Sequence, residues 1–228
     1  MGAVIVQLLP LALGAISPVL ILLIVLFLTS KGGITKSLAF IAGKYLAYVL
    51  WSFVFLGLAD KVGATGESGD PSTVSLVIKI LLGGLLLILA LQTYLGEDDP
   101  DAPPPKLLTS LDKMGPGKLF LVGILLSIIQ LRFVALVMAG VLIIAPAQLP
   151  AGQNLIAILI LALLMVWPML IPGVVFLAMG ESRQAALRSM DAWLDRNTRI
   201  ITVVVLGAFG VILLWAGLSG LFLEYTGE

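Results

Sequence analysis

The sequence predicts an all-α polytopic membrane protein with six transmembrane helices, arranged as two inverted three-helix repeats. Its 228 residues are 60% hydrophobic and only 11% charged, whereas about a quarter of the residues in an average soluble domain are charged. The apolar residues occur in long stretches, and basic residues gather in every second connection between them. Composition therefore predicts membrane insertion, and the stretches and charges together predict the topology.

Six apolar stretches are long enough to cross a bilayer as helices. They occupy residues 4–29, 34–59, 72–96, 118–146, 154–179 and 199–223. The first stretch has no basic residues before it and continues to Leu28, so we expect a retained span rather than a cleaved signal peptide. An acidic, proline-rich linker at 97–117 separates a first half, residues 1–96, from a second half, residues 118–228.

Basic residues predict the orientation of the spans. One side of the protein has only Lys61 in its connections, and the other side has nine basic residues: Lys31, Lys36, Lys106, Lys113, Lys118, Arg183, Arg188, Arg196 and Arg199. By the positive-inside rule the first, third and fifth connections are cytoplasmic and both termini lie outside. Each half has an odd number of spans, so the halves insert with opposite orientation, which is the inverted repeat found in many transporters.

The fifth connection contains a second type of membrane element. Within residues 181–198, the apolar residues Leu187, Met190, Trp193 and Leu194 recur at helical spacing. This pattern is typical of an amphipathic helix that lies on the cytoplasmic leaflet. An ordinary surface helix in a loop would give a similar pattern.

Three cations lie away from the ends of the predicted spans, namely Lys44, Lys79 and Arg132, and none of these spans contains Asp or Glu. About 14 residues separate Arg132 from either end of its span, roughly 21 Å of helix, so its side chain cannot easily reach water. Buried cations without carboxylates favour a cavity that receives a phosphate, sulfate or carboxylate group. Lys79 lies only about seven residues from the outer end of its span, so its ammonium group could instead reach the interface.

Prolines and polar residues at similar depth predict irregular backbone. Ser17-Pro18 lies near the middle of the first span, and Pro168 and Pro172 lie in the fifth. Proline removes a backbone donor and frees carbonyl groups, which a membrane tolerates only beside protein or a wet cavity. We therefore expect helix breaks at these prolines, with plain kinks as the alternative in the fifth span. The predicted substrate-binding residues are Arg132, Lys44, Gln130, Ser17, Pro18 and Lys79.

Small residues Ala39, Gly43 and Ala47 recur every four positions in the second span. Such a stripe allows two helices to approach closely, either within one subunit or between two copies in a homodimer.

Enzymatic chemistry has little support. The chain has no cysteine and no histidine, it has no carboxylate pair inside a span, and it lacks a phosphate-binding Gly-Lys-Ser loop. We expect no catalytic activity, no cofactor, no bound metal and no nucleic-acid partner.

Short motifs across nearly the whole chain carry a resemblance to a known family. They are Ile16-Ser17-Pro18, Thr29-Ser30-Lys31-Gly32, Leu38-Ala39-Phe40-Ile41-Ala42-Gly43, Leu111-Asp112-Lys113, Pro116-Gly117-Lys118, Trp193-Leu194-Asp195-Arg196 and Gly217-Leu218-Ser219-Gly220-Leu221. With these motifs the chain resembles the lysine-exporter (LysE) superfamily, and within it the actinobacterial branch of glycopeptidolipid- or sulfolipid-addressing proteins. The resemblance implies a six-span exporter-type protein of the bacterial plasma membrane, linked to the movement of polar lipids or their precursors.

One departure from the family concerns the fourth span. Relatives often have an Asn-Pro-Lys-type motif where this chain has Gln130-Leu131-Arg132. The cation remains as Arg132 but the helix-breaking proline is absent, so the sequence leaves open whether this span is unwound.

The functional prediction is an exporter of an anionic or amphiphilic substrate, such as a polar lipid or lipid precursor. Its partners would be that anionic lipid and the surrounding membrane lipids. Two alternatives stay open: an exporter of a small anionic solute such as an amino acid, and a non-transporting accessory subunit. The accessory subunit would dock a lipid synthase or a larger exporter through residues 181–198.

Overall fold

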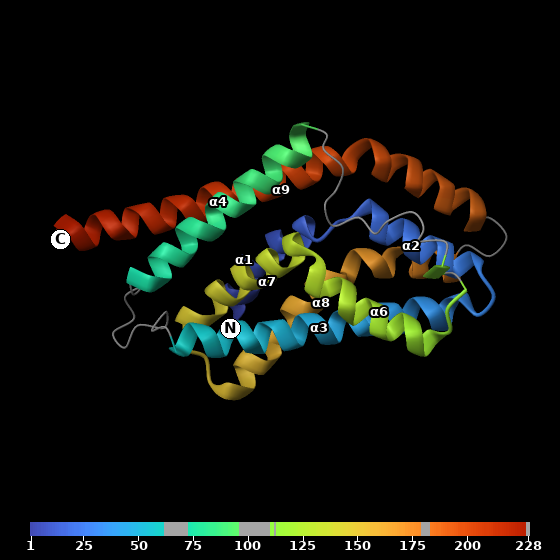
Figure 1. Ribbon diagram of the computed structural model, residues 1–228, viewed down its shortest axis with the longest axis horizontal. Helices are drawn as coiled ribbons and strands as arrows, with labels where there is room; N and C mark the ends of the chain where they lie inside the picture. Colours follow the sequence, from blue (N-terminus) through green and yellow to red (C-terminus); the bar gives the residue numbers. More distant parts are fainter. Residues whose placement is uncertain (62–72, 96–109, 112, 179–182, 227–228) are drawn as a thin grey trace.

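The computed structural model describes residues 1–61, 73–95, 110–111, 113–178 and 183–226. The described residues form helices and connections, with no β-strand among them (Figure 1). The helices are α1 (Gly2–Gly14), α2 (Pro18–Thr29), α3 (Gly33–Lys61), α4 (Thr73–Leu95), α6 (Pro116–Ile129), α7 (Leu131–Ile144), the short 3-10 helix η1 (Ala145–Ala147), α8 (Ala151–Ala178) and α9 (Arg183–Thr226).

By length and composition, four of these helices can each cross a membrane, and there are up to six spans if each of two bent helix pairs counts as one. The bent pairs are α1 with α2 and α6 with α7, and all six units begin and end near the stretches predicted from hydropathy. The prediction of an all-helical, multi-pass membrane protein is confirmed. The inverted orientation of the two halves stays a prediction.

Both bent pairs turn by 75°. In the first pair, Ser17 has extended backbone (φ −131°, ψ 115°) and Pro18 occupies the first turn of α2, where its fixed φ favours a helix start. Two helices of 13 and 12 residues, bent by this angle, still measure about 30 Å from end to end, which is the thickness of the hydrocarbon core. Either pair is thus long enough to be one broken span, although a re-entrant loop has the same local form.

The fourth span is broken although it has no proline. Gln130, with φ −75° and ψ 90°, ends α6 and begins α7. The question left open by the missing proline is therefore answered: the helix is interrupted at Gln130, two residues before Arg132.

The structure corrects the expectation of helix breaks at Pro168 and Pro172. Both prolines lie inside α8, which continues without interruption from Ala151 to Ala178. A proline in a helix removes one hydrogen-bond donor and crowds the carbonyl one turn earlier, and a helix absorbs this by bending. Both prolines are buried, so neighbouring helices pack around the affected turns.

The segment predicted to be an interfacial helix is helical, but it is not a helix of its own. Residues 183–198 belong to α9, a 44-residue helix that continues through the sixth span and is roughly 66 Å long. The side chains of residues 183–196 lie outside the described part of the chain, as does most of the linker at 97–117. The amphipathic surface and the division into two halves stay predictions.

Glycines bring two helix pairs into close contact. α4 and α9 lie side by side over much of their length (Figure 1), and a Cβ atom added to Gly83 would meet the carbonyl oxygen of Gly210 at 2.8 Å. On α3, a Cβ at Gly43 would overlap the carbonyl oxygen of Phe120 on α6. At Gly43, the small-residue stripe of the second span therefore serves packing within the subunit.

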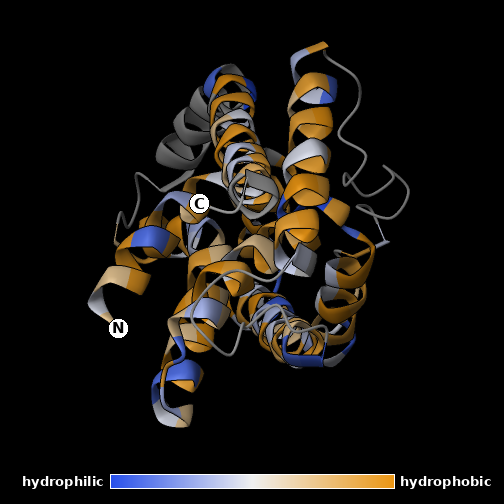
Figure 2. Cartoon of the chain, turned by 90° about the vertical axis from the view of Figure 1, so that its left-hand side faces the viewer, coloured by the Kyte–Doolittle hydropathy of each residue, from blue (hydrophilic) through white to orange (hydrophobic). Residues whose placement is uncertain are grey.

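Most helical residues are hydrophobic (Figure 2). Large apolar side chains such as Leu81, Ile129 and Trp215 are exposed. Exposed apolar side chains are expected where a protein faces lipid, because lipid tails are as apolar as these side chains and exposure there carries no hydrophobic cost.

Candidate cationic site at a broken helix

Lys44 lies in the middle of α3 and is wholly buried. Its Nζ donates a hydrogen bond of 2.6 Å to Oε1 of Gln130, which is 86 residues away in the sequence. Gln130 is the residue that joins α6 to α7. The ammonium group of Lys44, in the second span, therefore lies beside the break in the fourth span.

Three aromatic rings surround the ammonium group of Lys44. Nζ lies 5.9 Å from the ring centre of Phe40, 5.4 Å from that of Tyr48 and 5.3 Å from that of Phe133. Phe40 and Tyr48 flank Lys44 at four-residue spacing on α3, so all three share one helix face. Ring faces attract cations, and this contact lowers the cost of a positive charge inside the protein.

Arg132 lies in the first turn of α7 and is only 6% exposed. Its Cζ lies 5.1 Å from the same Phe133 ring that contacts Lys44. Both cations are thus gathered around one ring. They also lie at the N-terminus of α7, where backbone N–H groups add partial positive charge. The Lys44–Gln130–Arg132 cluster is a strongly positive region within the protein.

The predicted spans contain no Asp or Glu. Asp60 is the one acidic residue whose side chain is described, and it is exposed near the end of α3. Within the described residues, no group of His, Cys, Asp or Glu could hold a metal ion. In chemical terms, the cluster favours an anion.

The remaining predicted residues lie outside the cluster. Ser17 is buried at the break between α1 and α2, and the side chain of Pro18 is outside the described part of the chain. At this first break, Nε1 of Trp167 on α8 donates a 2.8 Å hydrogen bond to the carbonyl of Ala12. Lys79 lies half-buried on α4 and shares none of the contacts described for Lys44.

Sequence analysis missed the residues that support the site. The four-residue spacing of Phe40, Lys44 and Tyr48 is visible in the sequence and could have suggested an aromatic surrounding for the cation. Nothing in the sequence connects Phe133 to Lys44 or Trp167 to Ala12, because those contacts join different helices.

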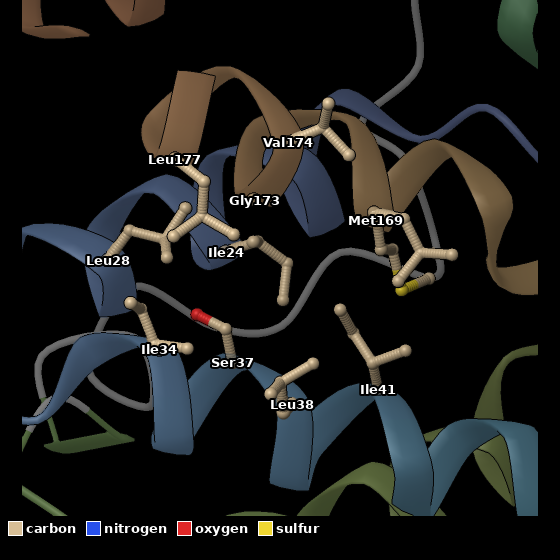
Figure 3. A pocket seen from close by; sticks show the side chains of 11 residues that line it. Ile24, Leu28, Ile34, Ser37, Leu38, Ile41, Met169, Gly173, Val174 and Leu177 are labelled. Atoms are coloured by element: carbon tan, nitrogen blue, oxygen red, sulfur yellow. The ribbon is translucent and has the colours of Figure 1, made fainter. Parts of the chain in front are cut away.

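An apolar pocket of about 230 Å³ lies between α2, α3 and α8 (Figure 3). Ile24, Ile41 and Met169 are buried in it, whereas Leu38, Val174 and Leu177 are exposed at its rim. The pocket therefore opens on the apolar outer surface of the helices. Ser37 of α3 is the one polar residue that lines it.

These features define a class: a multi-pass helical membrane protein with buried cationic side chains and an apolar pocket open on its outer surface. Sequence comparison gives the family. Residues 8–219 match the family model of Sap, the sulfolipid-1-addressing protein, so the chain belongs to this family. The match confirms the resemblance to the lipid-addressing branch, and it associates the chain with lipid export or addressing.

Membership of the wider lysine-exporter superfamily is not tested by this match and stays a prediction. Neither the comparison with curated proteins nor that with solved structures gave a match.

Proposed function

We propose that the protein moves an anionic polar lipid, or an anionic lipid precursor, across the bacterial plasma membrane. Lys44, Gln130 and Arg132 would bind the anionic headgroup at the break in the fourth span. The observation that carries this proposal is the 2.6 Å bond from Lys44 to Gln130, with Arg132 at the same aromatic ring. The planar guanidinium suits a two-pronged grip on phosphate, sulfate or carboxylate oxygens, and the ammonium suits a point contact.

The pocket between α2, α3 and α8 supports a lipid rather than a small solute. A solute exporter needs an enclosed polar cavity, whereas a lipid transporter needs a lateral opening that admits hydrocarbon. This pocket is apolar and opens on the outer surface. The family match supports the same substrate class.

The distribution of charged residues supports an orientation in the membrane and limits the possible energy sources for transport. We propose that both termini lie outside and that the first, third and fifth connections are cytoplasmic. The spans predicted from the sequence contain no carboxylate and no histidine for a proton relay. The driving force would therefore be the substrate gradient, the membrane potential or a partner protein, and we assign the chain no catalytic role.

The test is mass spectrometry of the lipids that remain bound after purification in mild detergent. Wild type is compared with Arg132→Gln and Lys44→Gln, and Lys79→Gln serves as control because it removes a membrane cation outside the cluster. A charge-assisted hydrogen bond contributes about 1.5–3 kcal/mol, so we expect an enriched anionic lipid to fall roughly tenfold in the two cluster variants and to persist in the control.

Other outcomes would overturn the proposal. The same bulk lipid in all four samples would remove support for a headgroup site, and a bound small acid would favour solute export. An accessory role would follow if Arg132→Gln kept lipid export in cells while substitution of Arg183, Arg188 and Trp193 abolished it.

A further inference from the structure

The hydroxyl of Ser37 differs from those of the buried serines Ser52 and Ser127. Ser52 and Ser127 each donate a 2.8 Å hydrogen bond to the carbonyl four residues earlier in their helix, which is the ordinary way to satisfy a hydroxyl inside a membrane helix. Ser37 is only 3% exposed, and within the described part of the chain its Oγ has no hydrogen-bond partner. Figure 3 shows this oxygen pointing into the apolar pocket.

We propose that this pocket binds one acyl chain of an anionic lipid from the adjacent leaflet, and that Ser37 donates a hydrogen bond to the carbonyl linking the chain to the headgroup. The inference rests on the proposed function for the class of lipid. It adds a second site, separate from the Lys44–Gln130–Arg132 cluster, at which the lipid docks from the bilayer.

The size and lining of the pocket fit hydrocarbon. An apolar cavity of about 150 Å³ stays dry and binds an apolar molecule, and this pocket is larger, at about 230 Å³. Because its rim residues Leu38, Val174 and Leu177 are exposed, a chain can enter sideways without passing through water. Water is a poor occupant, since Ser37 is the single polar side chain in the lining and a bound water needs two to four polar partners.

Two lysines near the start of α3 would orient the lipid. Lys31 and Lys36 lie in the turn between α2 and α3 and in the first turn of α3, beside Ser37, and Nζ of Lys36 donates a 3.0 Å hydrogen bond to Oγ of Ser30. An anionic headgroup would face these lysines, with its chain directed along α3 toward Ile41. Ser37 lies roughly 6 Å along the helix from Gly33, so it sits just below the headgroup level.

The docking site and the cationic cluster share helix α3. Ser37, Ile41 and Lys44 lie on one face of α3, at spacings of four and three residues, and Ser37 is roughly 10 Å from Lys44 along the axis. An acyl chain directed along α3 from Ser37 would therefore point toward the cluster.

The experiment uses the full chain reconstituted in vesicles that contain phosphatidylglycerol with a photoactivatable diazirine on one acyl chain. After illumination, labelled peptides are identified by mass spectrometry. We expect labelling concentrated on residues 33–41 of α3 and 169–177 of α8. Gly173→Leu should lower it at least fivefold, because Gly173 lines the pocket and its Cβ position is open, so the new side chain fills the pocket without a clash.

Matched variants separate docking from general effects. Gly207→Leu is the control, since Gly207 is also a partly exposed helical glycine with an open Cβ position, but on α9. Ser37→Ala should lower labelling about threefold. The double variant Lys31→Gln, Lys36→Gln should lower labelling by the phosphatidylglycerol probe. It should leave labelling by a phosphatidylcholine probe with the same chain unchanged.

Even labelling over all lipid-facing helices, or equal labelling in Gly173→Leu and wild type, would overturn the acyl-chain site. Neither result would affect the headgroup proposal, which depends on lipid retention in Arg132→Gln. Conversely, Arg132→Gln could retain as much anionic lipid as wild type while Gly173→Leu loses photolabelling. That result would support the acyl-chain site and overturn the headgroup site at the Lys44–Gln130–Arg132 cluster.

Discussion

Trp167 on α8 donates a hydrogen bond of 2.8 Å from its indole Nε1 to the carbonyl of Ala12, near the broken end of α1. The Lys44–Gln130 bond is its counterpart at the other break. In each case a side chain on an unbroken helix donates to a broken span, from α8 to the first span and from α3 to the fourth. A broken helix leaves backbone carbonyl groups without intrahelical partners. Trp167 binds such a carbonyl, whereas Lys44 binds the side-chain amide of Gln130, the residue at the break.

The indole bond predicts a stability effect for Trp167→Phe. This change keeps most of the aromatic surface but leaves the Ala12 carbonyl without its indole donor, so we expect a loss of about 1–2 kcal/mol. The measurement is thermal unfolding in detergent by circular dichroism. Trp215→Phe is the control, because Trp215 is 75% exposed, and equal melting temperatures for the two variants would contradict the prediction.

The bond between Lys44 and Gln130 predicts energetic coupling. In a double-mutant cycle with Lys44→Met and Gln130→Leu, we expect a coupling free energy of about 1–2 kcal/mol, since one partner is charged and both are buried. Denaturant unfolding in mixed micelles would measure it. The reference cycle pairs Lys44→Met with Trp215→Phe, whose effects should add. Additive effects in the first cycle as well would show that the 2.6 Å contact does not stabilise the fold.

The close approach of α3 and α6 predicts that Gly43→Ala is strongly destabilising. The added methyl group would overlap the carbonyl oxygen of Phe120, and forcing the helices apart costs about 1–3 kcal/mol or more. Gly57→Ala is the matched control in the same helix, because its Cβ position is open. That control should be neutral or slightly stabilising, since alanine favours helix over glycine. Comparable melting temperatures would rule out the close contact.

Orientation is directly testable because the chain has no cysteine. Lys31→Cys and Lys61→Cys each introduce one thiol at an exposed position. With a membrane-impermeant maleimide on intact cells, we expect labelling of Lys61→Cys at once and of Lys31→Cys only after permeabilisation. The reverse pattern would invert the proposed topology, and labelling of both variants in intact cells would exclude an odd number of crossings between the two positions.

Hydropathy alone predicted the six stretches to within a few residues. A helix inside a bilayer must satisfy its own backbone hydrogen bonds and match the hydrocarbon thickness, so the length of each apolar run carries the information. Pro18 likewise predicted the first break, because a proline at a helix start acts locally. Local signals were less reliable in the fifth span, where Pro168 and Pro172 stay inside a continuous helix.

The sequence by itself determined that this is a multi-pass helical protein of a lipid-addressing family, with cations and no carboxylate inside its predicted spans. Only the tertiary structure decided that the fourth span breaks at Gln130, that Lys44 and Arg132 gather at Phe133, and that α2, α3 and α8 leave an open apolar pocket. The physical reason is the range of the interactions. Hydropathy and proline effects act within one helix, whereas the Lys44–Gln130 bond joins residues 86 positions apart, and such contacts exist only once the helices have packed.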